Sequence, residues 1–125
     1  MKSTFKELEV WKTSKALRVY IFTLVKSFPH DEKFRLIDQM IRSSRSIGAN
    51  IAEGYGRYHY QDNIRFCIIA RGSAYELMDH VEVAVECEYI DTKQQELLDA
   101  QIEQVIALIN GYIKYLRSRK LKTKN

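Results

Sequence analysis

Proline and glycine are scarce in this sequence, with one proline and five glycines among 125 residues. Both residue types mark turns, so a chain with so few of them cannot supply the many turns of a β-sandwich or a β-barrel. Hydrophobic residues make up 46% of the chain, which excludes a disordered polypeptide and is enough to form a core. These proportions favour a few long helices in a single domain, 1–125.

Long apolar runs are also lacking. No window approaches the ~18 apolar residues of a membrane span, and the first residues contain no uninterrupted apolar stretch of a signal peptide. We therefore expect no export, no membrane partner and a cytoplasmic location. The two cysteines, Cys67 and Cys87, fall on one expected helix about 30 Å apart, which is too far for a disulfide and fits a reducing compartment.

Three breaks divide the chain into four expected helices. They are marked by Pro29, by Gly54 with Gly56, and by Asp91 with Thr92. Asp31 is a suitable cap for the second helix. Either Asp91 or Thr92 can cap the fourth, with Gln95 at capping-box spacing from Thr92. Because short connections make consecutive helices antiparallel, the sequence predicts an all-α, up-down-up-down four-helix bundle. Its helices are expected at about 5–28, 31–56, 61–88 and 92–117, followed by a frayed basic tail at 118–125.

Apolar residues recur at three- and four-residue steps within each expected helix, as a buried helical face requires. Small residues on the second and third helices would let these two helices approach closely at mid-height, with Ser44 and Gly48 opposite Ala70 and Ser73. The expected core positions are Val10, Leu17, Ile21, Leu24 and Phe28; Phe34, Ile37, Ile41, Ser44, Gly48, Ile51 and Tyr55; Phe66, Ala70, Ser73, Leu77, Val81 and Ala84; and Leu98, Ile102, Val105, Ile109, Tyr112 and Leu116.

Charge is unevenly distributed along the chain, although the net charge is only +4. Nine acidic residues lie between Glu76 and Glu103, where Lys93 is the one lysine or arginine. In an antiparallel bundle this segment lies at the Pro29 end, whereas the two termini and the middle connection meet at the other end. Lysines and arginines gathered there attract polyanions. They include the N-terminal Lys6, Lys12 and Lys15 and the candidate nucleic-acid contacts Arg57, Arg65, Arg71, Lys114, Arg117, Arg119 and Lys120.

Tyrosines are interleaved with these basic residues, at Tyr55, Tyr58, Tyr60, Tyr112 and Tyr115. Aromatic rings beside arginines stack on unpaired bases while the arginines hold phosphates, which favours RNA as the ligand. The alternative is a solvated surface in which the cations complement a helix C-terminus and the tyrosines line a subunit interface. The sequence leaves both interpretations open.

Catalytic chemistry has no visible basis in the sequence, because no nucleophile, base and orienting partner stand in a recognisable pattern. His30 and His59 fall in or near connections. His80 follows Glu76 by four residues, which fits a solvated ion pair better than a metal site, since a bundle metal site needs several inward glutamates. We therefore expect a non-enzymatic protein without catalytic residues, metal or cofactor.

The glycine pair near the second break is not a phosphate-binding loop, because it follows a helix and lacks the Gly-Lys-Ser/Thr ending. The neighbouring Glu53 lies close in sequence to arginines at positions 42, 45 and 57. Ion pairs with those arginines would position helices, and a carboxylate in such company is seldom a general base. We interpret Glu53 as structural.

A family resemblance is carried by the segment from Gln39 to Arg57, which contains Ser-Ile-x-x-Asn-Ile-Ala-Glu-Gly-x-Gly-Arg without a gap. Leu8-Glu9-Val10-Trp11, Phe28-Pro29 with Glu32, and the run from Ile69 to Leu77 agree in order. Over about residues 5–116 the chain resembles the four-helix bundle family named for 23S rRNA intervening sequences. Asn50, Glu53, Gly54 and Gly56 are the motif positions to which the resemblance gives a structural role.

The resemblance implies a homo-oligomer, pentameric in relatives, with basic surfaces that bind nucleic acid. It also adds Arg42, where many relatives carry a pair of arginines, and Arg45 to the candidate nucleic-acid contacts. The family is also similar to accessory proteins of diversity-generating retroelements, which partner a reverse transcriptase and its RNA. Large residues beyond what four helical faces need, namely Trp11, Tyr20, Phe22, Tyr112 and Tyr115, would be covered by association. The sequence thus predicts an RNA-binding homo-oligomer. The alternative is a protein scaffold or accessory subunit for a polymerase or reverse transcriptase.

Overall fold

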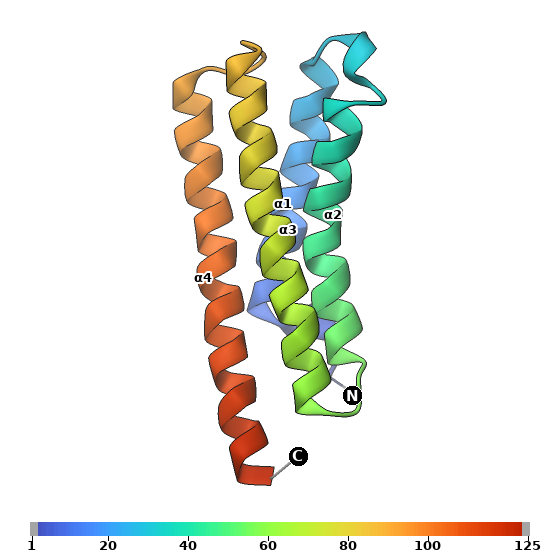
Figure 1. Cartoon of the computed structure of the whole chain (residues 1–125), viewed down its shortest axis with the longest axis vertical. Helices are drawn as coiled ribbons and strands as arrows, with labels where there is room; N and C mark the ends of the chain where they lie inside the picture. Colours follow the sequence, from blue (N-terminus) through green and yellow to red (C-terminus); the bar gives the residue numbers. More distant parts are fainter. Residues whose placement is uncertain (1–2, 124–125) are drawn as a thin grey trace.

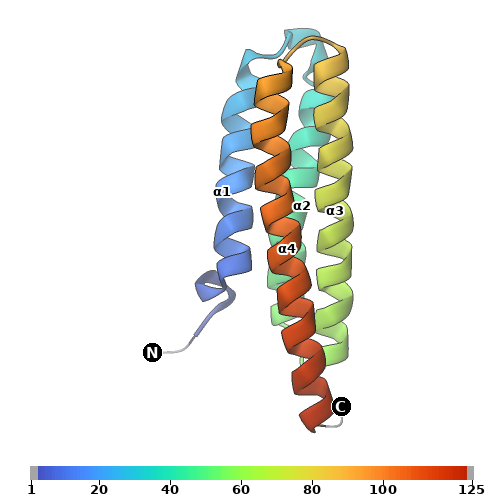
Figure 2. The same cartoon turned by 90° about the vertical axis from the view of Figure 1, so that its left-hand side faces the viewer.

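The computed structural model describes residues 3–123, and in that range the chain forms four α-helices and no strand. The helices are α1 (Glu9–Leu24), α2 (Leu36–Tyr55), α3 (Tyr60–Glu86) and α4 (Thr92–Thr123), and the short 3₁₀ turns are η1 (Phe5–Glu7), η2 (Val25–Ser27) and η3 (His30–Glu32). Figures 1 and 2 show that consecutive helices run in opposite directions and lie side by side. The predicted four-helix bundle is confirmed.

The core is one continuous apolar cluster along the bundle axis, with Leu17, Leu77, Leu98 and Ile102 fully buried. The predicted apolar faces of α3 and α4 are largely correct, because almost all of their positions are buried in the structure. Cys67 also belongs to this core, and burial raises the pKa of its thiol to about 12. The second cysteine, Cys87, is exposed beyond the end of α3, and neither cysteine forms a disulfide.

The start of the second helix differs from the prediction. α2 begins at Leu36, and Asp31 is not its cap but part of the 3₁₀ turn η3. The carboxylate of Glu32 points inward instead and accepts a hydrogen bond from the Leu36 amide at 3.3 Å. Phe34 therefore lies outside the helix and is 84% exposed, so its expected place in the core was wrong. Leu36 and Met40 take up the buried positions of this segment.

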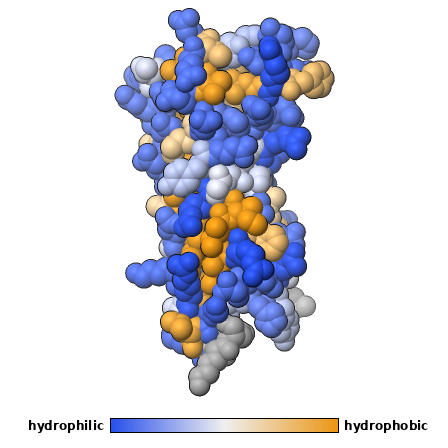
Figure 3. Space-filling model, viewed as in Figure 1, coloured by the Kyte–Doolittle hydropathy of each residue, from blue (hydrophilic) through white to orange (hydrophobic). Residues whose placement is uncertain are grey.

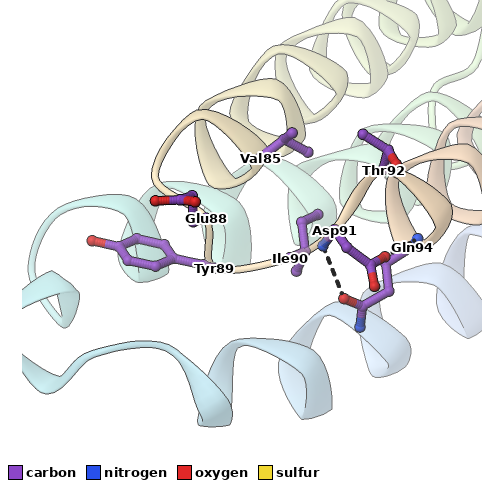
Figure 4. A pocket seen from close by; sticks show the side chains of 7 residues that line it. All are labelled: Val85, Glu88, Tyr89, Ile90, Asp91, Thr92 and Gln94. Carbon is purple, nitrogen blue, oxygen red and sulfur yellow. Dashed lines mark hydrogen bonds between the residues drawn. The ribbon is translucent and has the colours of Figure 1, made fainter.

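The connection between α3 and α4 is shaped by local hydrogen bonds (Figure 4). Glu88 adopts a left-handed conformation (φ 62°), and the amide of Tyr89 donates to the carbonyl of Ala84, which closes a Schellman motif at the end of α3. At the start of α4, the Asp91 carboxylate accepts from the Gln94 amide at 2.8 Å while the Gln94 side chain accepts from the Asp91 amide at 3.1 Å. Of the two caps that the sequence left open, Asp91 and Thr92, the structure has Asp91, and its capping-box partner is Gln94.

One side-chain contact ties the two connections at this end of the bundle. The Tyr89 hydroxyl donates to the Glu32 carboxylate at 2.6 Å, and the Tyr89 ring packs on Phe28 with centroids 5.2 Å apart. The hydrogen bond from Tyr89 lowers the pKa of Glu32 and, in return, raises the pKa of Tyr89 to about 12. The contact joins residues 57 positions apart in sequence, so it holds tertiary rather than local structure.

Replacing Tyr89 by phenylalanine is expected to lower the melting temperature at neutral pH by several degrees, because the Glu32 carboxylate loses its strongest partner. A group with a lowered pKa stabilises the fold above its unfolded pKa, about 4.3 for glutamate, and this contribution disappears as the pH falls. The difference between wild type and Y89F should therefore shrink in acid. Thermal melts followed by circular dichroism would test this, with Y75F as the exposed control; an equal difference at every pH would contradict it.

Small residues bring the helices together, but not as predicted. Gly48 does not face α3: a Cβ atom built on it would meet Arg18 and Ser14 of α1. Gly54 is the close approach between α2 and α3, since its Cβ would lie 2.7 Å from the Asn63 side chain and 3.0 Å from the Asn63 carbonyl. At mid-height the two helices are joined instead by hydroxyls, with Ser46 Oγ and Ser73 Oγ 2.9 Å apart.

The C-terminal segment also differs from the prediction. Residues 118–123 continue α4 as a helix instead of forming part of a frayed tail, and residues 124–125 of the predicted tail lie outside the described residues. Two contacts bring these turns against the start of α3. Lys120 donates a hydrogen bond to the Gln61 side chain, and a hydrogen bond to Tyr60 raises the pKa of Arg119. None of the helices in the described part of the chain has the length and hydropathy of a membrane-spanning helix.

Candidate nucleic-acid interface

The topology gathers three segments at one end of the bundle. Figures 1 and 2 show the first described residues, the connection between α2 and α3, and the end of α4 at the same end. The connections between α1 and α2 and between α3 and α4 lie at the opposite end. We call the end that holds the three gathered segments the basic end, and the opposite end the acidic end. The predicted convergence of the termini with the middle connection is confirmed.

The candidate contacts are divided by the fold. Arg57, Arg65, Lys114, Arg117, Arg119 and Lys120 lie in the half of the bundle that contains the basic end, and Arg71 lies farther along α3. Arg42 and Arg45 lie on α2 toward the acidic end. Arg42 is 13 residues before Tyr55, which corresponds to roughly 20 Å along the helix axis. These two arginines therefore cannot share one small ligand with the other contacts.

A pocket of about 520 Å³ lies at the basic end, and all five tyrosines singled out in the sequence line it. Its walls come from the η1 segment, the end of α2, the connection to α3 and α4, and they comprise Leu8, Tyr55, Arg57, Tyr58, His59, Tyr60, Asn63, Tyr112, Tyr115 and Leu116. We call it the tyrosine pocket. Sequence reasoning missed Asn63, although it continues the buried face of α3 one step before Cys67.

The tyrosines differ in how much of each ring is free. The rings of Tyr112 and Tyr115 are stacked with an interplanar angle of 11° and centroids 6.3 Å apart. Tyr112 is half-buried, burial raises the pKa of its hydroxyl, and that hydroxyl accepts a hydrogen bond from Asn63 at 3.2 Å. Tyr58 and Tyr115 are exposed, at 93% and 55%. The pocket thus has a half-buried, hydrogen-bonded inner ring, Tyr112, and two outer rings, Tyr58 and Tyr115, that are open to solvent.

Basic side chains in the half of the bundle that contains the tyrosine pocket fall into two groups. Arg57 pairs with Glu53 at 3.0 Å and lies over the Phe66 ring at 4.7 Å, and Arg65 pairs with Asp62 at 3.3 Å. Lys114 and Arg117 form no ion pair with any described residue. Because surface ion pairs in water are weak, both groups remain available to a polyanion, and the second group at lower cost.

The four motif residues, Asn50, Glu53, Gly54 and Gly56, make contacts within and between the helices. The Asn50 side chain donates to the Ser46 carbonyl at 2.8 Å, which holds α2 where Ser46 meets α3. Glu53 pairs with Arg57 alone; the expected pairs with the two other arginines are absent, because Arg42 pairs with Asp38 and Arg45 lies over the Phe22 ring. Gly54 permits the close approach to α3, and Gly56 caps α2 in an ordinary helical conformation.

The α3 and α4 face next to the basic end is partly apolar. Figure 3 shows apolar side chains gathered over these two helices in the half nearer the chain termini. A pocket of about 330 Å³ there is lined by Gln61, Ile64, Ile68, Arg117, Lys120 and Leu121. Polar and apolar surfaces therefore meet at the end of α4.

The acidic end carries the opposite charge. Its carboxylates include Asp99, whose pKa is raised by burial and by the neighbouring Glu103 and Glu82. Glu88 and Asp91 line a pocket of about 590 Å³ at the connection between α3 and α4 (Figure 4). His80 pairs with Glu76 at 3.3 Å, as its spacing predicts. Among the described residues no group of three His, Cys, Asp or Glu side chains is placed to hold a metal ion.

Comparison with known sequences decides the family. The family model described as "23S rRNA-intervening sequence protein" matches residues 6–111, most of the chain. The chain belongs to this family. The family match ends before Tyr112, so the last turns of α4, with Tyr115 and Arg117, extend beyond it.

A solved structure agrees with this family membership. It is the crystal structure at 1.70 Å resolution of a protein of unknown function from the S23 ribosomal protein family of Bacteroides thetaiotaomicron. That protein is similar to this chain with a TM-score of 0.77 and 31% sequence identity, and the alignment covers 84% of this chain and 95% of that chain. No curated protein matches the chain. Membership of the 23S rRNA-intervening sequence protein family therefore accounts for the fold of this chain, and its function depends on the residues of the site.

Proposed function

We propose that the protein is a non-enzymatic RNA-binding protein of the cytoplasm, and that unpaired bases enter the tyrosine pocket at the basic end. The observation that carries this proposal is the meeting of five tyrosines with Arg57 in one pocket, in the half of the bundle that also contains Arg65 of α3 and Lys114 and Arg117 of α4. Single-stranded nucleic acid is bound by this combination, since aromatic rings stack on bases and cations neutralise phosphates. A duplex would leave the pocket unfilled because its bases are already stacked.

The exposed rings and cations have distinct tasks in this proposal. Tyr58 and Tyr115 present exposed rings for stacking, and the Tyr112 ring stacks against the Tyr115 ring. Arg117 and Lys114 lie on the same helix and contribute charge toward the backbone of the strand. No nucleophile or general base is required, because binding alone accounts for the arrangement.

A binding assay with single-stranded RNA tests the proposal. The affinity of an oligouridylate should fall steeply as salt rises, and Arg117→Glu should weaken binding and reduce the log–log salt slope by roughly 0.7 or more, the value for one phosphate contact on a single strand. Lys93→Glu makes the same charge change at the acidic end and should bind like wild type. Absent binding, or equal losses in the two variants, would refute an RNA site at the basic end.

Self-association is the second part of the proposal. Val19, Tyr20 and Phe22 are 55%, 41% and 45% exposed on α1, and such apolar surface favours a further protein contact. Trp11 does not contribute, because it is 8% exposed and its ring packs on Phe5. We expect a homo-oligomer, a pentamer if it follows the family resemblance. Light scattering coupled to gel filtration would measure its mass, and a monomer at micromolar concentration would contradict this part.

A protein partner is the other candidate function. The acidic end offers exposed carboxylates, including Glu86, Glu88 and Asp91, that suit a basic surface of a polymerase or reverse transcriptase. A partner that stays bound after nuclease treatment, together with no direct RNA affinity, would favour this scaffold function over the RNA site.

A further inference from the structure

A second cationic pocket lies on η1 and α1, outside the tyrosine pocket. Its volume is about 650 Å³, and it is lined by Lys6, Trp11, Lys12, Lys15 and Arg18. Four of the five lining residues are cations, and no carboxylate lines the pocket. A cavity of this composition selects an anion.

The four cations are not neutralised by the protein itself. None of them forms an ion pair with a described residue, in contrast to Arg57 and Arg65 at the tyrosine pocket. Lys15 Nζ lies 5.6 Å and the Arg18 guanidinium 5.3 Å from the centre of the Trp11 ring. These cation–π contacts hold two of the charges near the pocket without cancelling them, because the indole ring is uncharged.

The occupant of this pocket cannot be a stacked base. Trp11 is 8% exposed, and Lys15 and Arg18 lie over its ring. Since the aromatic surface is covered and the accessible groups are ammonium and guanidinium, the matching chemistry is that of phosphate groups. Lys12, Lys15 and Arg18 follow each other at three-residue steps, which spreads their charges over about 9 Å of helix and suits more than one phosphate.

The η1 turn separates this pocket from the tyrosine pocket and contacts both. The Phe5 ring lies against Trp11 at 5.2 Å and against Tyr55 at 6.5 Å. Lys6 lines the pocket on α1, and Leu8 lines the tyrosine pocket. The two sites are therefore neighbours across one turn of backbone, with no carboxylate in the lining of either.

We propose that an RNA strand whose bases occupy the tyrosine pocket continues over η1 onto α1, where Lys6, Lys12, Lys15 and Arg18 hold its next phosphates. This inference rests on the proposed function. It adds the path that the strand takes over the protein surface beyond the tyrosine pocket. The other route, along α3 and α4, passes a pocket in which Arg117 and Lys120 alternate with apolar side chains, namely Ile64, Ile68 and Leu121. On the α1 route four of the five residues that line the pocket are cations, which is the higher share of the two routes.

Salt dependence of binding tests the route. With an oligouridylate of about twelve nucleotides, the double variant K12A/K15A should reduce the log–log salt slope by about 1.4, which corresponds to two phosphates at 0.7 each. The matched control K26A/K93A removes two lysines at the acidic end and should keep the wild-type slope. If the two double variants have the same slope while Arg117→Glu still weakens binding, the α1 route is wrong and the RNA site stands. If wild type binds no RNA, both proposals fail.

The single tryptophan gives an independent readout. Phosphates that draw Lys15 and Arg18 toward themselves change the surroundings of Trp11, so its emission should shift when the twelve-nucleotide strand binds. The dinucleotide UpU fills the tyrosine pocket without reaching α1, and it should leave Trp11 emission unchanged while competing with the longer strand. An emission shift with UpU equal to that with the long strand, or none with the long strand at saturation, would overturn the assignment.

Discussion

Replacing Gly54 by alanine is expected to lower the free energy of unfolding by roughly 1–2 kcal/mol. The added methyl group would lie 2.7 Å from Asn63 Oδ1, 3.0 Å from the Asn63 carbonyl oxygen and 3.0 Å from Phe66 Cβ. The amide side chain can turn away, but the backbone of α3 cannot, so α2 and α3 must separate slightly. Overpacking of this kind lowers the free energy of unfolding by about 1–3 kcal/mol. The higher helix preference of alanine offsets about 0.4–1 kcal/mol of this loss.

The chain contains two matched controls for this substitution. Gly72 and Gly111 also lie inside helices, and a Cβ atom on either would meet nothing within 4 Å. Gly72→Ala and Gly111→Ala should therefore raise the free energy of unfolding by about 0.4–1 kcal/mol each. Chemical denaturation of the three variants would measure all of these values. A G54A protein as stable as the controls would show that the contact between α2 and α3 is loose.

Replacing Tyr115 by alanine is expected to weaken RNA binding roughly 5-fold to 150-fold at constant salt. Stacking of one base on an aromatic ring contributes about 1–3 kcal/mol, and Tyr115 has the more supported of the two open rings in the tyrosine pocket. Since no charge is changed, the salt slope should stay at the wild-type value. This separates the loss of stacking from the loss of phosphate contacts.

Tyr75 provides the control for Tyr115. Both side chains are 55% exposed, and Tyr75 lies on α3 outside the tyrosine pocket. Tyr75→Ala should bind RNA with wild-type affinity, and the melting temperatures of the two variants should be similar. Equal affinities for the two variants in fluorescence anisotropy titrations would mean that bases do not stack in the pocket.

The sequence predicted those parts of the fold that depend on spacing within one helix. The buried faces of α3 and α4 follow from apolar residues at three- and four-residue steps, and Asp91 caps α4 because capping is decided by neighbours in the chain. The end of α2 near Gly56 is likewise a local property. For the same reason the topology followed from three breaks and short connections.

The errors arose where distant residues override local preference. Asp31 is a good cap by local rules, yet α2 starts at Leu36 because Glu32 is drawn inward by Tyr89. The basic C-terminal residues have no local reason to remain helical, and contacts of Arg119 and Lys120 with the start of α3 extend α4. Neither partner can be found from spacing alone.

The candidate site was predicted in composition but not in extent. The five tyrosines were identified because the topology brings the end of α2, the start of α3 and the end of α4 together, and they do line one pocket. Arg42 and Arg45 were added to the candidate contacts from the family resemblance, and their position along α2 separates them from the tyrosine pocket. Lys6, Lys12 and Lys15 were expected at the basic end, but the pocket that they form with Trp11 was not predicted, because the cavity depends on how η1 folds against α1.

Because the bundle has an even number of antiparallel helices, its first and last helices begin and end at the same end of the molecule, and this decides where a tag or label can be attached. An affinity tag fused at either terminus would begin beside the proposed RNA surface and compete with the ligand for space. A fluorophore is better attached at Cys87, whose thiol is exposed at the far side, while Cys67 is shielded by burial from alkylation. Maleimide chemistry on the unmodified chain would thus place a single reporter where it disturbs binding least.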